Sequence, residues 1–288
     1  MGMLRIRTRY YRNIARSLLL LIILTSCGIN EAKTPEQWFD FTWSGLAGCD
    51  ALTFRGLAAL QRGSEQVLEE SISYTGQLKE HRELKIKAEP DGGNPAGRFH
   101  RMQTPGTGKS AGFEAMLRWE DGDWLLQSQE SDALLQGMKR LNPLDQLEEI
   151  RRIPPAAKKI SAESGAARGT KVLRIELDPA EAGIRLKDKL LSEMELLRQD
   201  WDKKLANVPP EKRVKLQKEL SSIWTAGNEQ LQQRLESMEA GVVYHLTIDR
   251  KSGLPARLTS ETTMEYWSPQ GTRQREVLRT DNRFVDYK

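Results

Sequence analysis

The chain has 288 residues, with 44 Lys and Arg against 40 Asp and Glu and a formal net charge of +4. Five of the arginines lie within the first 26 residues, which contain no acidic side chain. The 44 basic residues less these five leave 39 against 40 acidic ones, a net charge of −1, so nucleic-acid binding has no support. No run of roughly 18 or more apolar residues occurs, which argues against a hydropathic transmembrane helix.

Residues 1–26 have the order of an export signal. An arginine-rich segment precedes the apolar stretch Leu18–Leu24, which is too short to remain as a membrane span. Leu24-Thr25-Ser26-Cys27 resembles the bacterial lipoprotein box, in which a branched apolar residue and two small residues precede a cysteine. The resemblance implies a signal peptide over 1–26 and diacylglycerol on Cys27, which would anchor the protein at the extracytoplasmic face of the cell membrane. An ordinary secretory signal or a short uncleaved anchor is the alternative.

The predicted elements after a tether over residues 27–33 form a single domain over 34–288. Thr34-Pro35-Glu36 predicts the start of a first helix, with Thr as the N-cap. Alternation of apolar and polar residues predicts strands over 52–60, 67–78, 84–88, 98–102, 113–119 and 124–127. The last two flank Asp121-Gly122, a sequence typical of a tight hairpin turn.

Helical spacing returns in the middle of the chain. Residues 134–150 predict a helix that is interrupted at Asn142-Pro143, and a strand over 171–177 follows. Apolar residues then recur every three or four positions over 180–240, on both sides of Pro209-Pro210. This pattern predicts two amphipathic helices that form a hairpin.

The C-terminal 48 residues again have the pattern of strands. The strands predicted here cover 242–248, 258–267, 273–279 and 284–287. Turn residues separate them, including Asp281-Asn282 between the last two. Short strands joined by turns are typical of an antiparallel meander.

Two short sequences carry a resemblance to a known family. Tyr244–Pro255 is similar to a segment of the lipoprotein-carrier superfamily in which a strand is followed by a turn with an Asp and then by Gly-Leu-Pro. Asn142-Pro143-Leu144 resembles the start of the mid-chain helix of that superfamily. These proteins are the LolA/LppX-like half-barrels. The resemblance implies an α+β fold: a curved antiparallel β-sheet packed on helices, here with an inserted helical hairpin over 180–240.

The resemblance also implies a non-catalytic protein that binds a lipid or another apolar ligand on the concave face of the sheet. The candidate lining residues are Phe54, Leu57, Ile72, Tyr74, Met116, Trp119, Trp124, Leu246, Ile248, Met264, Tyr266 and Leu278. One sequence does not separate a lined cavity from a filled core, in which these residues would pack against the helices. In the alternative function, the helical hairpin binds an envelope- or spore-associated protein, and the core is filled.

Motifs that would indicate an enzyme, a metal site or a cofactor are weak. His81, His100 and His245 lack metal-ligand spacing, and Cys49 has no local histidine, so we expect Cys49 to be a small buried residue. Residues 106–110 resemble the end of a phosphate-binding loop, but the full pattern needs a glycine where Gln103 stands. We therefore expect a glycine-rich surface loop there, no catalytic residue, no metal and no cofactor.

Overall fold

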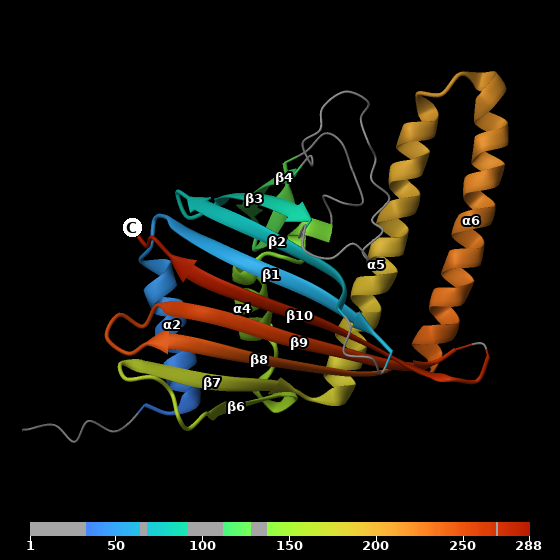
Figure 1. The fold of residues 1–288 in the computed structure, drawn as a ribbon. Helices are drawn as coiled ribbons and strands as arrows, with labels where there is room; N and C mark the ends of the chain where they lie inside the picture. Colours follow the sequence, from blue (N-terminus) through green and yellow to red (C-terminus); the bar gives the residue numbers. More distant parts are fainter. Residues whose placement is uncertain (1–32, 64–67, 91–111, 128–136, 269) are drawn as a thin grey trace, which may run out of the picture. The chain divides into compact units, whose positions relative to one another are not determined.

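A ten-stranded antiparallel sheet forms the body of the protein (Figure 1). The computed structural model describes residues 33–63, 68–90, 112–127, 137–268 and 270–288. The predicted export signal, Cys27, the strand predicted over 98–102 and the glycine-rich segment 106–110 lie outside the described residues, as does most of the predicted tether. The predicted fold class is confirmed: the structure is α+β, with a curved, open antiparallel sheet, helices and an inserted helical hairpin.

The sheet consists of two meanders that meet at its centre. Its strand order is β5-β4-β3-β2-β1-β10-β9-β8-β7-β6, so the first strand of one meander pairs with the last strand of the other. The strands are β1 (Leu52–Arg62), β2 (Leu68–Lys79), β3 (Glu83–Pro90), β4 (Phe113–Glu120), β5 (Asp123–Leu126), β6 (Lys158–Ala162), β7 (Thr170–Leu177), β8 (Glu239–Asp249), β9 (Pro255–Trp267) and β10 (Arg273–Val285).

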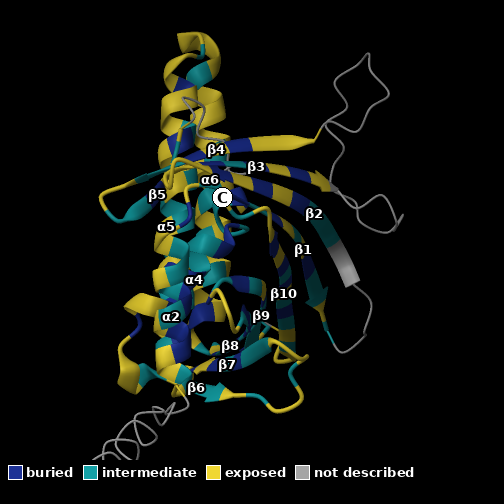
Figure 2. Cartoon of the chain, turned by 90° about the vertical axis from the view of Figure 1, so that its left-hand side faces the viewer, coloured by how far each residue is buried: buried dark blue, intermediate teal, exposed yellow. Residues whose placement is uncertain are grey.

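The helices lie on the concave face of the sheet (Figure 2). They are α2 (Pro35–Ala47), α4 (Pro143–Arg152), the 3-10 turn η1 (Pro155–Ala157), α5 (Pro179–Ala206) and α6 (Pro210–Glu236). Side chains of α2, α4 and the first turns of α5 join the strands in one apolar core, which includes Phe39, Leu147, Ile150 and Ala182. Every second residue of the central strands therefore points into this core.

Local sequence signals explain several element boundaries. The side chain of Asn142 accepts a hydrogen bond from the backbone N–H of Leu144, and that of Asp178 accepts from Ala180, so both residues cap the helices that follow. α4 starts at this cap, where the sequence predicts the interruption, and it ends at Arg152. Asp121 and Gly122 have φ values of 50° and 87°, which match the predicted tight turn between β4 and β5.

The C-terminal strand differs from its prediction. Asp281 and Asn282 were expected to form a turn, but β10 continues through them without a break and pairs with β1 on one side and β9 on the other. Asn282 is fully buried and accepts a hydrogen bond from the Tyr74 hydroxyl at 2.8 Å. A partner on a distant strand has overridden the local turn preference of Asp-Asn.

Helices α5 and α6 form the predicted hairpin, with Pro209 and Pro210 at the start of α6. Arg213 donates hydrogen bonds to the carbonyl oxygens of Ala206 and Val208, which closes the end of α5. Farther along, the indole N–H of Trp224 donates to Met194 at 3.2 Å. With 28 and 27 residues, the helices are each about 40 Å long and extend well away from the strands at their connected end (Figure 1).

Candidate functional site

The concave face of the sheet carries an aromatic floor at its centre. Phe54 on β1 lies opposite Gly76 on β2, and Tyr74 on β2 lies opposite Gly56 on β1. A Cβ atom at position 76 would stand 2.0 Å from the Phe54 ring, and one at position 56 would stand 2.2 Å from the Tyr74 ring. Each ring therefore lies flat across the backbone of the neighbouring strand, where only glycine leaves room.

Most of the predicted lining residues share this face. They are Phe54, Ile72, Tyr74, Trp119, Trp124, Leu246, Ile248, Met264, Tyr266 and Leu278. Phe54, Leu246 and Ile248 have no exposed surface, and they pack with α4 in the continuous core. At these three positions the concave face is filled by packed side chains.

Leu57 and Met116 lie on the opposite face. Strand residues alternate between the two faces of a sheet. Leu57 is out of phase with Phe54 on β1, and Met116 is out of phase with Ala115 and Leu117 on β4. Both side chains are therefore exposed, by 41% and 42%, and neither belongs to the aromatic floor.

A line of polar groups crosses the floor between β9, β10 and β2. The hydroxyls of Ser260 on β9 and Thr280 on β10 lie 2.6 Å apart. Asn282, also on β10, accepts a hydrogen bond from the hydroxyl of Tyr74 on β2. Burial raises the pKa of Tyr74, so this hydroxyl stays protonated and donates to Asn282. The side-chain N–H group of Asn282 has no hydrogen-bond partner in the described part of the chain.

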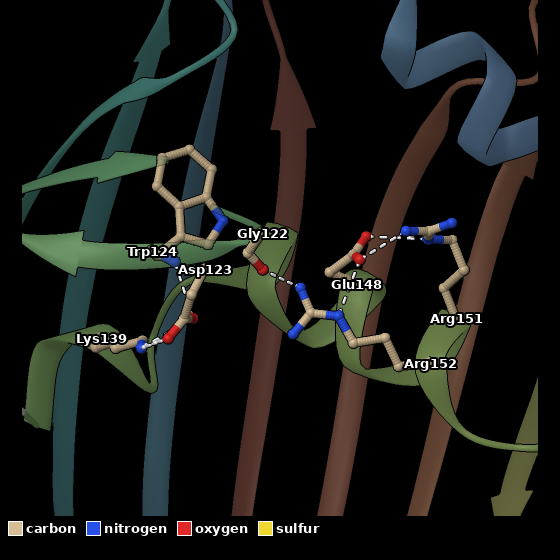
Figure 3. A network of polar contacts seen from close by, with 7 residues as sticks. All are labelled: Gly122, Asp123, Trp124, Lys139, Glu148, Arg151 and Arg152. Carbon is tan, nitrogen blue, oxygen red and sulfur yellow. Dashed lines mark hydrogen bonds and ion pairs between the residues drawn. The ribbon is translucent and has the colours of Figure 1, made fainter. Parts of the chain in front are cut away.

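A polar network joins the β4–β5 turn to α4 (Figure 3). Glu148 on α4 is 3% exposed and binds both Arg151 and Arg152, at 2.8 Å and 3.0 Å. Arg152 also donates to the carbonyl oxygen of Gly122, while Asp123 binds Lys139 at 3.0 Å. Although burial alone raises the pKa of Glu148, the two arginines outweigh it and hold the pKa below its ordinary value. The network fixes α4 against one end of the sheet.

An open groove lies where the helical hairpin meets the sheet. Its volume is about 610 Å³, within the range usual for sites that bind small molecules. The lining residues come from the first turns of α5, the end of α6 and the paired ends of β8 and β9: Pro179, Ala180, Gly183, Ile184, Lys187, Leu235, Met238, Glu239, Ala240, Gly241, Thr263 and Glu265. None of the predicted lining residues is among them.

Apolar and small residues form most of the groove wall. Ile184 is 58% exposed, although a large aliphatic side chain is normally covered. Gly183 stands beside it, and a Cβ atom there would meet nothing within 4 Å. Leu235 and Met238 belong to the apolar stripe that predicts the second helix of the hairpin. In the structure they line an open space together with residues of α5 and β8, which the spacing of the stripe does not indicate.

The charged side chains around the groove differ in whether they have an ion-pair partner. Arg273 binds both Glu239 and Glu265, at 2.8 Å and 2.7 Å, and Arg275 lies 3.6 Å from Glu265, so two arginines face these two carboxylates. Lys187 has no ion-pair partner among the described residues. The groove therefore combines an apolar wall with one cation that an anionic group can approach.

The hairpin is held to the body on the other side of α5. Glu193 forms an ion pair with Arg140, which lies just before α4, and desolvation by burial lowers the pKa of Arg140. α5 is thus held by Ala182 in the core and, farther along, by this pair to the segment before α4.

No metal-binding or membrane-spanning element was found in the described ranges. Within them, His, Cys, Asp and Glu form no group of three or more that could hold a metal ion. None of the described helices is both long and apolar enough to cross a membrane. Cys49 is buried, and its thiol donates to the carbonyl oxygen of Gly45 at 3.4 Å, as expected for a structural cysteine.

Comparisons with known proteins give only distant similarities. No protein family model and no curated protein matches the sequence. Among solved structures, a lipovitellin structure on lipid–protein interactions is similar over 83% of this chain and 25% of its own, at 7% identity and a TM-score of 0.35. This chain thus spans about a quarter of lipovitellin. A LolA superfamily protein from Nitrosomonas europaea is similar over 89% of this chain and 94% of its own, at 8% identity and a TM-score of 0.21.

Proposed function

We propose that this protein binds an acyl chain or a similar apolar ligand without catalysing a reaction, and that the ligand lies in the groove between α5, α6 and the ends of β8 and β9. The observation that carries the proposal is an open volume of about 610 Å³ with an apolar wall, next to a sheet whose buried floor is already packed. Removal of apolar surface from water supplies the affinity, at roughly 0.8 kcal/mol for each buried methylene.

Lys187 gives the groove a preferred ligand chemistry. An unpaired ammonium group at the edge of an apolar wall suits a ligand with an anionic head and an apolar tail. Glu239 and Glu265 would repel such a head, but Arg273 pairs with both. A fatty acid is the simplest molecule with these two parts, so it is the appropriate probe.

The proposed site of binding differs from the site that the sequence predicts. That prediction placed the ligand on the concave face of the sheet, whereas the groove lies at the end of the sheet and is built partly by the inserted hairpin. Anchoring by diacylglycerol at Cys27 remains part of the proposal and rests on the lipoprotein box alone.

Filling the groove tests the proposal. Gly183→Leu adds an aliphatic side chain at a helical position with open space around it, so the helix accommodates the change. It takes the place of about three ligand methylenes, which corresponds to about 2.4 kcal/mol and a roughly fiftyfold weaker Kd. The measurement is a titration of the purified full-length chain with the fluorescent fatty acid cis-parinaric acid.

Gly227→Leu is the matched control, since Gly227 lies on α6, also has open space around it and does not line the groove. We expect this variant to bind the probe like the unmodified chain. Equal affinities of the Gly183→Leu variant and the unmodified chain would refute binding in the groove.

One observation favours a second function, in which the hairpin binds an envelope protein. Val214 is 74% exposed and Ile223 63% exposed on α6, away from the groove. Native mass spectrometry of protein extracted from cells separates the two functions. A bound acyl ligand supports the groove, whereas ligand-free protein with a partner that is lost on Ile223→Glu substitution supports the hairpin.

A further inference from the structure

The convex face of the sheet, which Figure 1 shows toward the viewer, carries a row of arginines. Arg55 on β1 lies directly opposite Arg283 on β10, and Arg283 lies directly opposite Arg257 on β9. All three are exposed. On the other side of Arg55 the row continues across β2, where Thr75 lies opposite Arg55, to β3, where Lys87 lies opposite Thr75. Four basic side chains thus lie on one line across the sheet.

Like charges directly opposite each other on neighbouring strands destabilise a sheet. On the rest of this face arginines have acidic partners: Arg279 binds Glu261 at 2.9 Å, and Arg257 binds Asp281 through two hydrogen bonds of 2.7 Å. Arg55 and Arg283, in contrast, have no ion-pair partner among the described residues. The nearest carboxylate along β10 on this face, Asp281, is held by Arg257, so Arg55 and Arg283 face each other without an ion-pair partner of their own in the described part of the chain.

Apolar side chains accompany the two unpaired arginines. Leu57 follows Arg55 by two positions and is 41% exposed, and Val285 follows Arg283 by two positions and is 37% exposed. Residues two apart on a strand share a face, so the leucine and the valine stand beside the guanidinium groups. We call Arg55, Leu57, Arg283 and Val285 the arginine patch.

We propose that the arginine patch docks on an anionic phospholipid bilayer, with Arg55 and Arg283 binding lipid phosphates and Leu57 and Val285 lying at the boundary of the acyl region. Guanidinium groups bind phosphate through paired hydrogen bonds, and cations beside apolar side chains are typical of proteins that lie on a membrane surface. An acidic peptide would match the arginines but not the two apolar side chains. The inference concerns the convex face and is independent of the groove.

Binding to vesicles tests the proposal. The full-length chain is mixed with vesicles of phosphatidylcholine alone, and with vesicles that also contain phosphatidylglycerol, and the bound fraction is measured by flotation. The predicted export signal also carries five arginines that favour the anionic bilayer, and every variant keeps it, so the informative quantity is how far each variant lowers the gain that phosphatidylglycerol gives. Each basic side chain near an anionic surface contributes about 1 kcal/mol, so Arg55→Gln with Arg283→Gln should reduce that gain about thirtyfold.

Arg118→Gln with Arg279→Gln is the matched control. It removes the same charge from the same face, outside the groove, but Arg118 is paired with Glu120 and Arg279 with Glu261. We expect this variant to keep most of the gain. Equal losses in the two double variants would overturn the proposal, because they would show a general charge effect.

Two further measurements separate the remaining outcomes. The thermal midpoint of the Arg55→Gln, Arg283→Gln variant should be no lower than that of the unmodified chain, because the substitutions remove a repulsion; a clear decrease would contradict the premise. Binding to polyglutamate is measured in parallel. If the arginine patch variant loses polyglutamate binding and keeps its gain on phosphatidylglycerol, the partner is an acidic protein and the bilayer proposal is wrong.

Discussion

Replacement of Gly76 by alanine should destabilise the protein, because the Phe54 ring occupies the place of the new methyl group. The Cβ atom would stand 2.0 Å from Cζ of Phe54 and 2.4 Å from Cε1. The ring has no exposed surface, and the rings of Tyr74 and Phe284 pack around it with centroids 6.4 Å and 6.3 Å away. Phe54 therefore has no free space into which it could turn.

The expected change in stability follows from two opposing effects. Overpacking of a filled core costs about 1–3 kcal/mol. Alanine in place of glycine within a strand returns roughly 0.5–1 kcal/mol, since the unfolded chain loses less entropy on folding. A Cβ atom at 2.0 Å from the ring places the cost in the upper part of its range, so the net effect is a loss of about 1–2.5 kcal/mol, which lowers the thermal midpoint by about 2–4 °C for each kcal/mol.

Urea denaturation of Gly76→Ala, followed by tryptophan fluorescence, measures this loss. Gly227→Ala is the control, because a Cβ atom at that helical position meets nothing within 4 Å, and it should gain up to about 1 kcal/mol. In a Phe54→Leu background, which removes the ring, Gly76→Ala should cost much less. If Gly76→Ala is as stable as the unmodified chain, the flat packing of Phe54 on the sheet is refuted.

Two further predictions concern buried polar groups. Tyr74→Phe removes the hydrogen bond of 2.8 Å to Asn282, whose N–H group already lacks a partner, so we expect a loss of about 1–3 kcal/mol in urea denaturation. Tyr266→Phe, whose hydroxyl binds the partly exposed Glu276, should lose less, and equal losses would contradict the role of burial. Glu148→Gln should cost about 1–3 kcal/mol at pH 7, because the carboxylate binds Arg151 and Arg152. Since the pKa of Glu148 lies below its ordinary value of 4.5, its contribution is complete above pH 4.5 and is lost as the pH falls through the folded-state pKa. The unmodified chain should therefore lose more stability than Glu148→Gln between pH 5 and pH 3, and parallel curves would contradict this reading.

Local patterns were sufficient to predict most of the helices, strands and turns. The Asp121-Gly122 hairpin, the caps before α4 and α5 and the two helices around Pro209-Pro210 depend on residues close together in the sequence. Backbone geometry and capping act over a few residues, so their signals are readable without a structure. The continuous β10 was missed because Asp281-Asn282 has local turn preferences, whereas the partner of Asn282 is 208 residues away.

The candidate site was less predictable than the fold. The alternation of strand residues identifies two faces, but it does not tell which face the helices cover, and Leu57 and Met116 were therefore assigned to the wrong side. The groove was missed because Gly183, Leu235 and Thr263 lie on three elements that meet only in space. The lipoprotein box at Cys27 stays a prediction from sequence.

The sequence by itself determined the distribution of charge along the chain and most of the helices, strands and turns, because periodicity, capping residues and turn residues act locally. Only the tertiary structure decided which strands are neighbours. The pairing of β1 with β10 brings Arg55 opposite Arg283, and the return of α6 to β8 opens the groove beside α5. Both depend on contacts between residues far apart in the chain, for which a single sequence carries no local signal.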